Sequence, residues 1–311
     1  MTTAAEAPTT LVGEPVRRVE DPSLITGAAK YLDDLKLPGM AHVAILRSPY
    51  AHARIKSIDT SAAEAAPGVV AVFTGKDFEH LPPLPCAWQA GGVENLVNTP
   101  RALEIDRVTF TGAGVAAVVA ESKAQAEDAR ELIDVDWEPL DVIVDVEAAA
   151  ADGAMQLHEN APGNIAMDWS VGDADATDRA LGEAEVVVKQ RLVNQRLIPN
   201  PMEVRGAAAT YEPATGQYTV WMTSQDPHIM RLLMTAFVFG IPETKMRCIA
   251  LHVGGGFGTK IFLYHEYVLM AAIAEKVGRP VKWMETRSEN YAATTSRTSR
   301  WARSATARSR R

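Results

Sequence analysis

Four glycines and one phenylalanine stand together at residues 254–258, within the stretch HVGGGFGTK that runs from His252 to Lys260. Glycine lets a backbone approach a ligand closely and adopt conformations that other residues avoid. Backbone amides ahead of a helix suit an anionic or strongly polar group. Phe257 would be exposed by its glycine neighbours. The segment from Gly254 to Lys260, which we call the glycine loop, is therefore the first candidate for a binding site.

Two common nucleotide-binding motifs do not fit the glycine loop. A phosphate loop needs Gly-Lys-Ser/Thr, whereas the sequence here is Gly258-Thr259-Lys260. The dinucleotide pattern G-x-G-x-x-G, read from Gly254, would need glycine at position 259. A glycine-rich turn without a ligand is a further alternative, but it leaves the aromatic residue unexplained.

The elements predicted around the glycine loop bring a second polar residue to it. Residues 218–223 have strand composition and lead to Gln225, and an Asp-Pro pair then predicts a helix over 227–239. A strand at 246–253 leads into the glycine loop, and a helix at 261–277 follows it. Strands joined by a helix favour parallel pairing, and open α/β sheets bind ligands at the carboxyl ends of such strands. We therefore expect Gln225 and the glycine loop at one sheet edge.

The first half of the chain has the pattern of a separate α/β module. Ser122 and Gln125 form an S-x-x-Q capping box that predicts a helix over 123–133. Strand-like runs flank this helix, at 40–47, 68–74, 114–120 and from 135. Turn residues mark a connecting region, and a second module is expected to open with strands at 184–193 and 205–211.

Several ordered stretches resemble one family. HVGGGFGTK, MTSQDPH at 222–228 and ETRSEN at 285–290 are similar to the molybdenum-binding large subunit of the xanthine dehydrogenase/aldehyde oxidase family, especially its carbon monoxide dehydrogenase-like bacterial branch. The opening VGEPVRRVEDPSLITGAAKYLDDLKLPGMAHVAILRSPYAHARI and the stretch RLIPNPMEVRGAAA extend the likeness to about residues 11–295.

The resemblance implies an α+β or α/β fold, with a hammerhead domain followed by the first part of a molybdopterin-binding domain. On this basis we predict a mobile lead-in at 1–20, the hammerhead domain at 21–145 and a connector at 146–180. An incomplete molybdopterin-binding part follows at 181–295, and an Arg/Ser-rich tail at 296–311.

The resemblance also assigns cofactor-binding residues. Gln225 matches the glutamine that approaches the molybdenum centre, and Phe257 matches the loop beside the metal's oxo ligand. The glycines expected to share this role are Gly254, Gly255, Gly256 and Gly258. No catalytic residue is predicted among these 311 residues, and no side chain is expected to ligate the metal, which would be held through the pterin. We expect His228 to start a helix and His252 to lie at the edge of the core.

The activity that the resemblance implies is hydroxylation of a small substrate with oxygen from water, with electrons leaving through Fe–S and FAD. The implied cofactor is molybdenum-molybdopterin, in its cytosine dinucleotide form. The implied partners are an FAD-binding medium subunit and a 2Fe–2S small subunit, arranged as a dimer of heterotrimers. Purine-oxidising relatives carry a substrate-binding glutamate where this chain has Ile261, which disfavours purines; Glu266 is a weak substitute. An aldehyde, an N-heterocycle and carbon monoxide are left open.

Composition narrows the setting. The net charge is −8, and without the six arginines of residues 297–311 it becomes −14, so the body of the chain is expected to repel nucleic acid. Apolar runs are too short to span a bilayer, and the first residues do not resemble a secretory signal, which predicts a cytoplasmic protein. Cys86 and Cys248 form no CxxC pair.

Two hypotheses of different class follow. In the first, the chain is the N-terminal portion of a molybdenum hydroxylase, active only if another chain supplies the remainder or if the arginine-rich tail reflects a shifted reading frame. In the second, it is a truncated, noncatalytic module for subunit interaction or binding, and its tail is a basic arm. The family's members are more than twice as long, and we expect the isolated 311-residue product to lack stoichiometric molybdenum.

Overall fold

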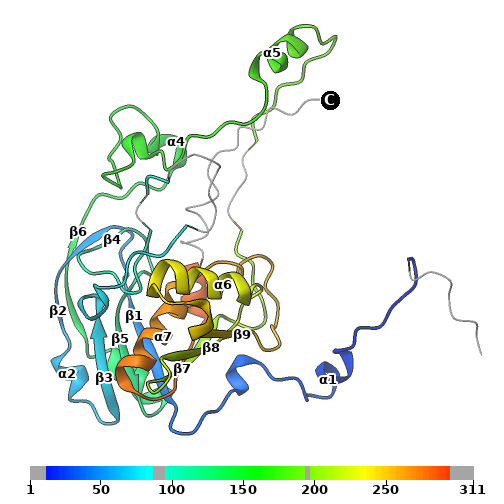
Figure 1. Cartoon of the computed structure of the whole chain (residues 1–311). Coiled ribbons are helices and arrows are strands. Elements are labelled where there is room, and N and C mark those ends of the chain that lie inside the picture. Colours follow the sequence, from blue (N-terminus) through cyan, green and yellow to red (C-terminus); the bar gives the residue numbers. More distant parts are fainter. Residues whose placement is uncertain (1–11, 87–94, 98, 193–196, 295–311) are drawn as a thin grey trace, which may run out of the picture.

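One seven-stranded sheet contains strands from both predicted parts of the chain. The computed structural model describes residues 12–86, 95–97, 99–192 and 197–294. The strand order is β3-β5-β1-β10-β7-β8-β9. Figure 1 labels all of these strands except β10. The strands are β1 (Ala41–Arg47), β3 (Val69–Thr74), β5 (Gly114–Ala120), β7 (Gly206–Glu212), β8 (Gln217–Met222), β9 (Met246–Ile249) and β10 (Val281–Met284). A three-stranded sheet, β4-β2-β6, consists of β4 (Arg107–Val108), β2 (Ala53–Asp59) and β6 (Asp134–Pro139).

Parallel pairing of β1 with β10 joins the two parts. Ala41 lies opposite Val281, and His42 lies opposite Lys282. The other neighbours in the large sheet pair antiparallel, except β8 and β9, which are parallel as predicted. The sheet is therefore continuous across what the sequence pattern predicted as two modules.

Helices cover the sheet on both faces. The α-helices are α1 (Asp21–Ile25), α2 (Ser61–Glu64), α3 (Lys123–Arg130), α4 (Val146–Ala149), α5 (Ala174–Gly182), α6 (Pro227–Leu233), α7 (His265–Val277) and α8 (Arg287–Glu289). Short turns of 3-10 helix are η1 (Leu32–Asp34), η2 (Gly75–Phe78), η3 (Pro162–Asn164) and η5 (Glu243–Lys245), and π-helical turns are η4 (Met234–Phe239) and η6 (Asn290–Thr294).

The continuous apolar run of β5 is explained by these two covering layers. Ala117 and Val119 belong to the core cluster that contains the buried face of α7, whereas Ala116 and Val118 pack with Ala129 of α3. Every residue of β5 is buried. A strand covered on both faces has no solvent-exposed face, so its sequence does not alternate between apolar and polar residues. The predicted strand at 114–120 and the Ser122 cap of α3 are confirmed.

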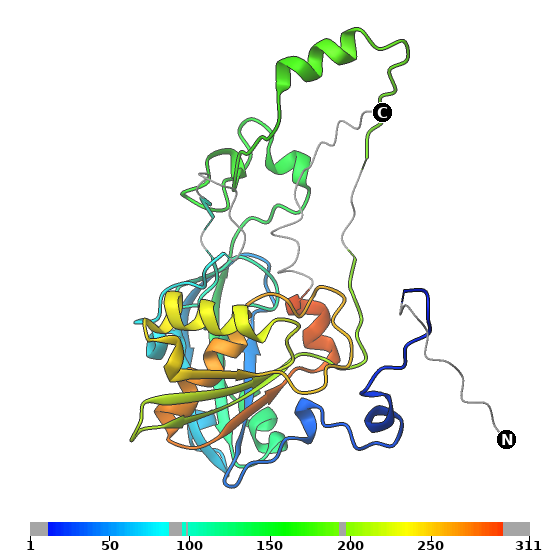
Figure 2. The ribbon, with the colours of Figure 1, turned by 45° about the vertical axis from the view of Figure 1, so that its right-hand side comes forward.

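The predicted strand at 184–193 is wrong over its described residues, 184–192. These residues form no strand, and Val186 and Val188 are 77% and 80% exposed. A strand needs a partner for its backbone hydrogen bonds, and the described residues supply none here. The segment that carries α4 and α5 extends away from the two sheets (Figure 2).

Four element boundaries also differ from the prediction. α3 ends at Arg130 rather than at 133. β9 ends at Ile249 rather than at 253, because the backbone turns toward the glycine loop. α7 begins at His265 rather than at 261, after the loop has closed. α6 ends at Leu233 and continues as the π-helical turn η4, and Gly240 ends this turn in a left-handed conformation, which glycine adopts readily. None of the helices in the described part of the chain is long and apolar enough to cross a bilayer.

Candidate functional site: the glycine loop and Gln225

Gln225 and the glycine loop meet at the carboxyl ends of two parallel strands. β8 ends three residues before Gln225, and β9 leads into Gly254. Asp226 caps α6 by accepting a hydrogen bond from the backbone N–H of Ile229, which fixes the chain direction immediately after Gln225. The predicted juxtaposition at one sheet edge is confirmed.

The side chain of Gln225 organises the loop. Its Oε1 accepts hydrogen bonds from the backbone N–H groups of Gly258, at 3.0 Å, and Lys260, at 3.3 Å. The backbone N–H of Gln225 donates in turn to the Lys260 carbonyl, at 2.9 Å. Within the described residues no acceptor lies at its Nε2, so this exposed amide can donate to a ligand.

The glycines have specific steric roles. A Cβ on Gly256 would lie 2.3 Å from Gln225 Oε1, so only glycine allows Gln225 this close. Gly255 and Gly258 have φ values of +95° and +86°, a region that disfavours other residues. Phe257 has a φ of +50° and is 75% exposed. A large apolar ring held outward by a strained backbone is a feature that ligand sites frequently show.

One carboxylate that the sequence reasoning missed holds the base of the loop. Glu203 Oε2 accepts from the backbone N–H of Gly254 at 2.8 Å and from Lys260 Nζ at 2.9 Å. Lys260 is fully buried, and burial lowers its pKa while Glu203 opposes that shift. Lys260 is thus engaged with protein, as expected if the loop is no phosphate loop. The 57-residue separation of the pair left no local pattern to find it by.

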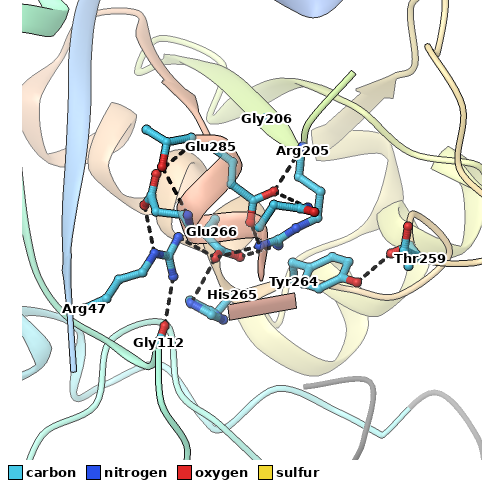
Figure 3. Close-up of polar contacts among 12 residues, drawn as sticks. Arg47, Gly112, Arg205, Gly206, Thr259, Tyr264, His265, Glu266 and Glu285 are labelled. Atoms are coloured by element: carbon cyan, nitrogen blue, oxygen red, sulfur yellow. Dashed lines mark hydrogen bonds and ion pairs between the residues drawn. The ribbon is translucent and has the colours of Figure 1, made fainter. Parts of the chain in front are cut away.

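A buried network of ion pairs lies behind the loop (Figure 3). Glu266 binds Arg47 at 3.0 Å and Arg205 at 3.0 Å, and Arg205 also pairs with Glu285. Burial opposes the charge of Arg205, but Glu266 and Glu285 outweigh it and raise the pKa of this guanidinium. The network joins β1 of the first half to α7 and to the residues that flank β7 and β10.

The arginine network reaches the loop through Tyr264. The Arg205 guanidinium stacks over the Tyr264 ring, at 3.9 Å from its centroid. The Tyr264 hydroxyl donates to the Thr259 carbonyl inside the loop, at 2.5 Å (Figure 3). The charged groups of the network are buried, whereas Gln225 and Phe257 are exposed.

Glu266 does not substitute for the missing substrate-binding glutamate. Its side chain is fully buried and bound to two arginines, so it is not available to a ligand at the surface. Ile261, at the position concerned, is 46% exposed. An apolar side chain is therefore accessible at this position, as predicted.

The two histidines near the site have other surroundings. His252 Nδ1 contacts the Lys30 backbone, and its ring lies near Tyr31. His228 is exposed on the first turn of α6. Across the described ranges, no three His, Cys, Asp or Glu side chains gather as a metal site.

The site has the features of a surface for a polar, planar or anionic group. Gln225 offers a neutral amide donor, the glycines leave backbone within reach, and Phe257 offers an apolar face. Gly258 has open space where a side chain would stand. These features fit a bulky cofactor with polar edges, and nothing in them supplies direct metal ligands.

Comparison with known proteins identifies two domains. The family "Aldehyde oxidase and xanthine dehydrogenase, a/b hammerhead domain" matches residues 26–141. The family "Molybdopterin cofactor-binding domain" matches residues 157–310. The predicted fold class, a hammerhead domain followed by the start of a molybdopterin-binding domain, is confirmed.

Individual relatives agree with this. The carbon monoxide dehydrogenase large chain of Afipia carboxidovorans is 40% identical over 290 residues, which cover 89% of this chain and 35% of that protein. The nicotine 6-hydroxylase large subunit of Paenarthrobacter nicotinovorans is 37% identical over 284 residues, covering 91% and 34%. The crystal structure of quinoline 2-oxidoreductase from Pseudomonas putida matches with a TM-score of 0.76 and 38% identity, covering 89% and 35%.

The chain spans about a third of the length of these relatives. The matched third includes both described domains, and the likeness in sequence and in fold extends over nearly the whole chain. The chain therefore belongs to the xanthine dehydrogenase and aldehyde oxidase family, and it is similar to about a third of the large chain of carbon monoxide dehydrogenase.

Proposed function

We propose that this chain forms one wall of the molybdopterin site of a molybdenum hydroxylase. The observation that carries the proposal is the contact of Gln225 with the glycine loop, which leaves an amide donor and an exposed Phe257 on one surface. This combination lies in the region matched by the molybdopterin cofactor-binding domain.

The residues that would hold the cofactor are Gln225, Phe257 and the glycines Gly254, Gly255, Gly256 and Gly258. Gln225 would donate from Nε2, adding no charge, and the glycine backbone would let the cofactor's polar edge approach closely. Phe257 would exclude water on one side. When bound, the cofactor supplies transfer of oxygen from water to substrate and uptake of the electrons released.

The proposed substrate is a small molecule that has few polar groups where it faces Ile261. An aldehyde, an N-heterocycle or carbon monoxide meets this condition, whereas the exposed apolar Ile261 offers no acceptor or donor to a purine edge. Relatives named as a carbon monoxide dehydrogenase chain and a nicotine 6-hydroxylase subunit are consistent with that range.

The remaining parts of the proposal concern the complex. The cofactor is molybdenum-molybdopterin in the cytosine dinucleotide form, and electrons pass to 2Fe–2S clusters and FAD on a small and a medium subunit. Two such heterotrimers form a dimer in the cytoplasm. The names of relatives as large chains and large subunits support partner chains in general.

A chimaera tests the cofactor role. Residues 11–295 would replace the matched segment of the Afipia carboxidovorans large chain, and molybdenum would be measured by mass spectrometry and pterin by fluorescence after oxidation. We expect stoichiometric molybdenum in the chimaera, less in its Gln225→Ala form, and none in the isolated 311-residue chain. A folded chimaera that holds neither pterin nor molybdenum would exclude the proposal and favour a noncatalytic interaction module.

A further inference from the structure

One carboxylate binds both ends of the glycine loop. Glu203 lies just before β7, more than 50 residues from the loop in sequence, yet its Oε2 binds both Gly254, at the first end, and Lys260, at the last. The Glu203 backbone N–H also donates to the Gly254 carbonyl, at 3.2 Å. The two ends of the loop are thus held against one side chain.

Space around the carboxylate supports this role. A Cβ on Gly254 would lie 2.6 Å from Glu203 Cβ, so the loop backbone rests directly on the Glu203 stem. Lys260 links this contact to the site, because its backbone N–H and carbonyl bind Gln225. Glu203, Lys260 and Gln225 therefore close a ring of contacts around residues 254–260.

Glu203 itself has a rigid support. Two residues along, the backbone of Arg205 exchanges hydrogen bonds with Glu285, at 2.9 and 3.2 Å, and its guanidinium binds Glu266. A buried ion pair such as Glu203–Lys260 is weak evidence for stability, because the loss of hydration offsets most of its Coulomb attraction. The pair instead constrains the conformation of the loop, because one carboxylate oxygen that accepts from both Gly254 and Lys260 fixes the distance between the loop ends.

We propose that Glu203 is a positioning residue, which sets the conformation of the glycine loop through Gly254 and Lys260 so that Gln225 and Phe257 face the ligand together. The proposed function enters only as the identity of that ligand. Hydrogen exchange measures the conformation of the loop in the 311-residue chain without cofactor, so a negative result is distinguishable from failure of the chimaera to bind molybdopterin.

The test is hydrogen exchange at glycine amides after labelling the chain with isotopic glycine. In Glu203→Met, the amides of Gly254 and Gly258 should exchange about tenfold faster, since a charge-assisted hydrogen bond is lost and the loop ends separate. The amides of Gly206 and Gly278, which donate to Thr223 and Ala274, should keep their rates. Glu203→Gln, which keeps an acceptor oxygen, should give an intermediate change at Gly258.

Two further variants make the outcome decisive. Glu243→Met removes an exposed carboxylate bound to Arg231 and should leave all four amides unchanged. Glu203→Met alone leaves Lys260 buried without its partner and should lower the melting temperature. The double variant Glu203→Met with Lys260→Met removes both charges of the pair and should restore the melting temperature, while the Gly258 amide still exchanges fast. Equal acceleration at all four amides, slow Gly258 exchange in the double variant, or loss of folding in both Glu203→Met and the double variant would overturn the proposal.

Discussion

At the scale of single residues, the candidate site depends on two glycines whose lack of a side chain leaves room for neighbouring residues. Gly256 has no side chain, and Gln225 occupies the space where one would lie. Gly254 also has none, and the stem of Glu203 fills that space. The two glycines face different kinds of neighbour, a movable side-chain end and a fixed stem, which predicts unequal costs for the same substitution.

Gly256→Ala and Gly254→Ala separate these two cases. In Gly256→Ala the exposed Gln225 can turn aside, so we expect a loss below about 1 kcal/mol in the free energy of unfolding, with faster exchange at Gly258. In Gly254→Ala the methyl meets Glu203 Cβ at 2.6 Å, and overpacking should cost about 1–3 kcal/mol. Denaturant unfolding measures both, and the reverse order would contradict this account of the loop.

Arg205 is the residue on which the buried carboxylates depend. Arg205→Met leaves Glu266 and Glu285 without a shared counter-ion, and removing one partner of a buried pair costs about 3–5 kcal/mol. Urea unfolding of the variant measures this loss. Arg191→Met removes an exposed arginine bound to Glu147 and should have no measurable effect. Equal midpoints for Arg205→Met and the unsubstituted chain would show that the network contributes little.

At the scale of elements, the pairing of β1 with β10 decides how the first half meets the second. His42 lies opposite Lys282 in this pairing. Burial, Lys282 and Lys123 lower the pKa of His42 below its ordinary value of 6.5, and Asp33 opposes them. The unfolded chain, whose histidine has a pKa near that ordinary value, therefore binds a proton more readily than the folded one.

The resulting pH dependence has a defined sign. Well above pH 6.5 His42 is neutral in both states and has no effect; as pH falls through 6.5, the unfolded state gains a proton first and stability is lost. His42→Gln should therefore reduce the fall in melting temperature between about pH 7 and pH 5. His228→Gln, at an exposed histidine, is the control. An identical slope in His42→Gln and the unsubstituted chain would refute the assignment.

At the scale of the whole molecule, one connection between elements carries several exposed apolar side chains. Val186, Val188, Leu197 and Met202 are between 71% and 93% exposed. They lie on the connection from the outlying α5 to β7 (Figure 2). Exposed apolar groups in one segment are typical of an interaction surface, and the segment falls within the molybdopterin cofactor-binding match.

Substitution of the exposed valines tests this view of the segment. Val186→Thr with Val188→Thr should leave the melting temperature unchanged, because neither side chain packs on the core, and should reduce binding of an apolar dye. Val118→Thr, at a fully buried position in β5, should lower the melting temperature by burying a hydroxyl. A comparable loss in the double variant would show that the segment is packed in solution.

The sequence by itself determined the features that depend on neighbouring residues. The apolar run of β5, the Ser122 cap and the glycine loop were all predictable, because each reflects a local pattern of residues. Gln225 and the loop could be placed together because strand–helix–strand connections have a preferred topology. Their role toward a cofactor stays a prediction.

Only the tertiary structure decided the features that join distant residues. Glu203 meets Lys260 across 57 positions, and Arg47 meets Glu266 across 219, so no local pattern marks either pair. The strand composition of 184–192 produced no strand, because a strand forms only where another strand accepts its hydrogen bonds. The joining of both halves in one sheet depends on the pairing of β1 with β10, which also depends on partners far along the chain.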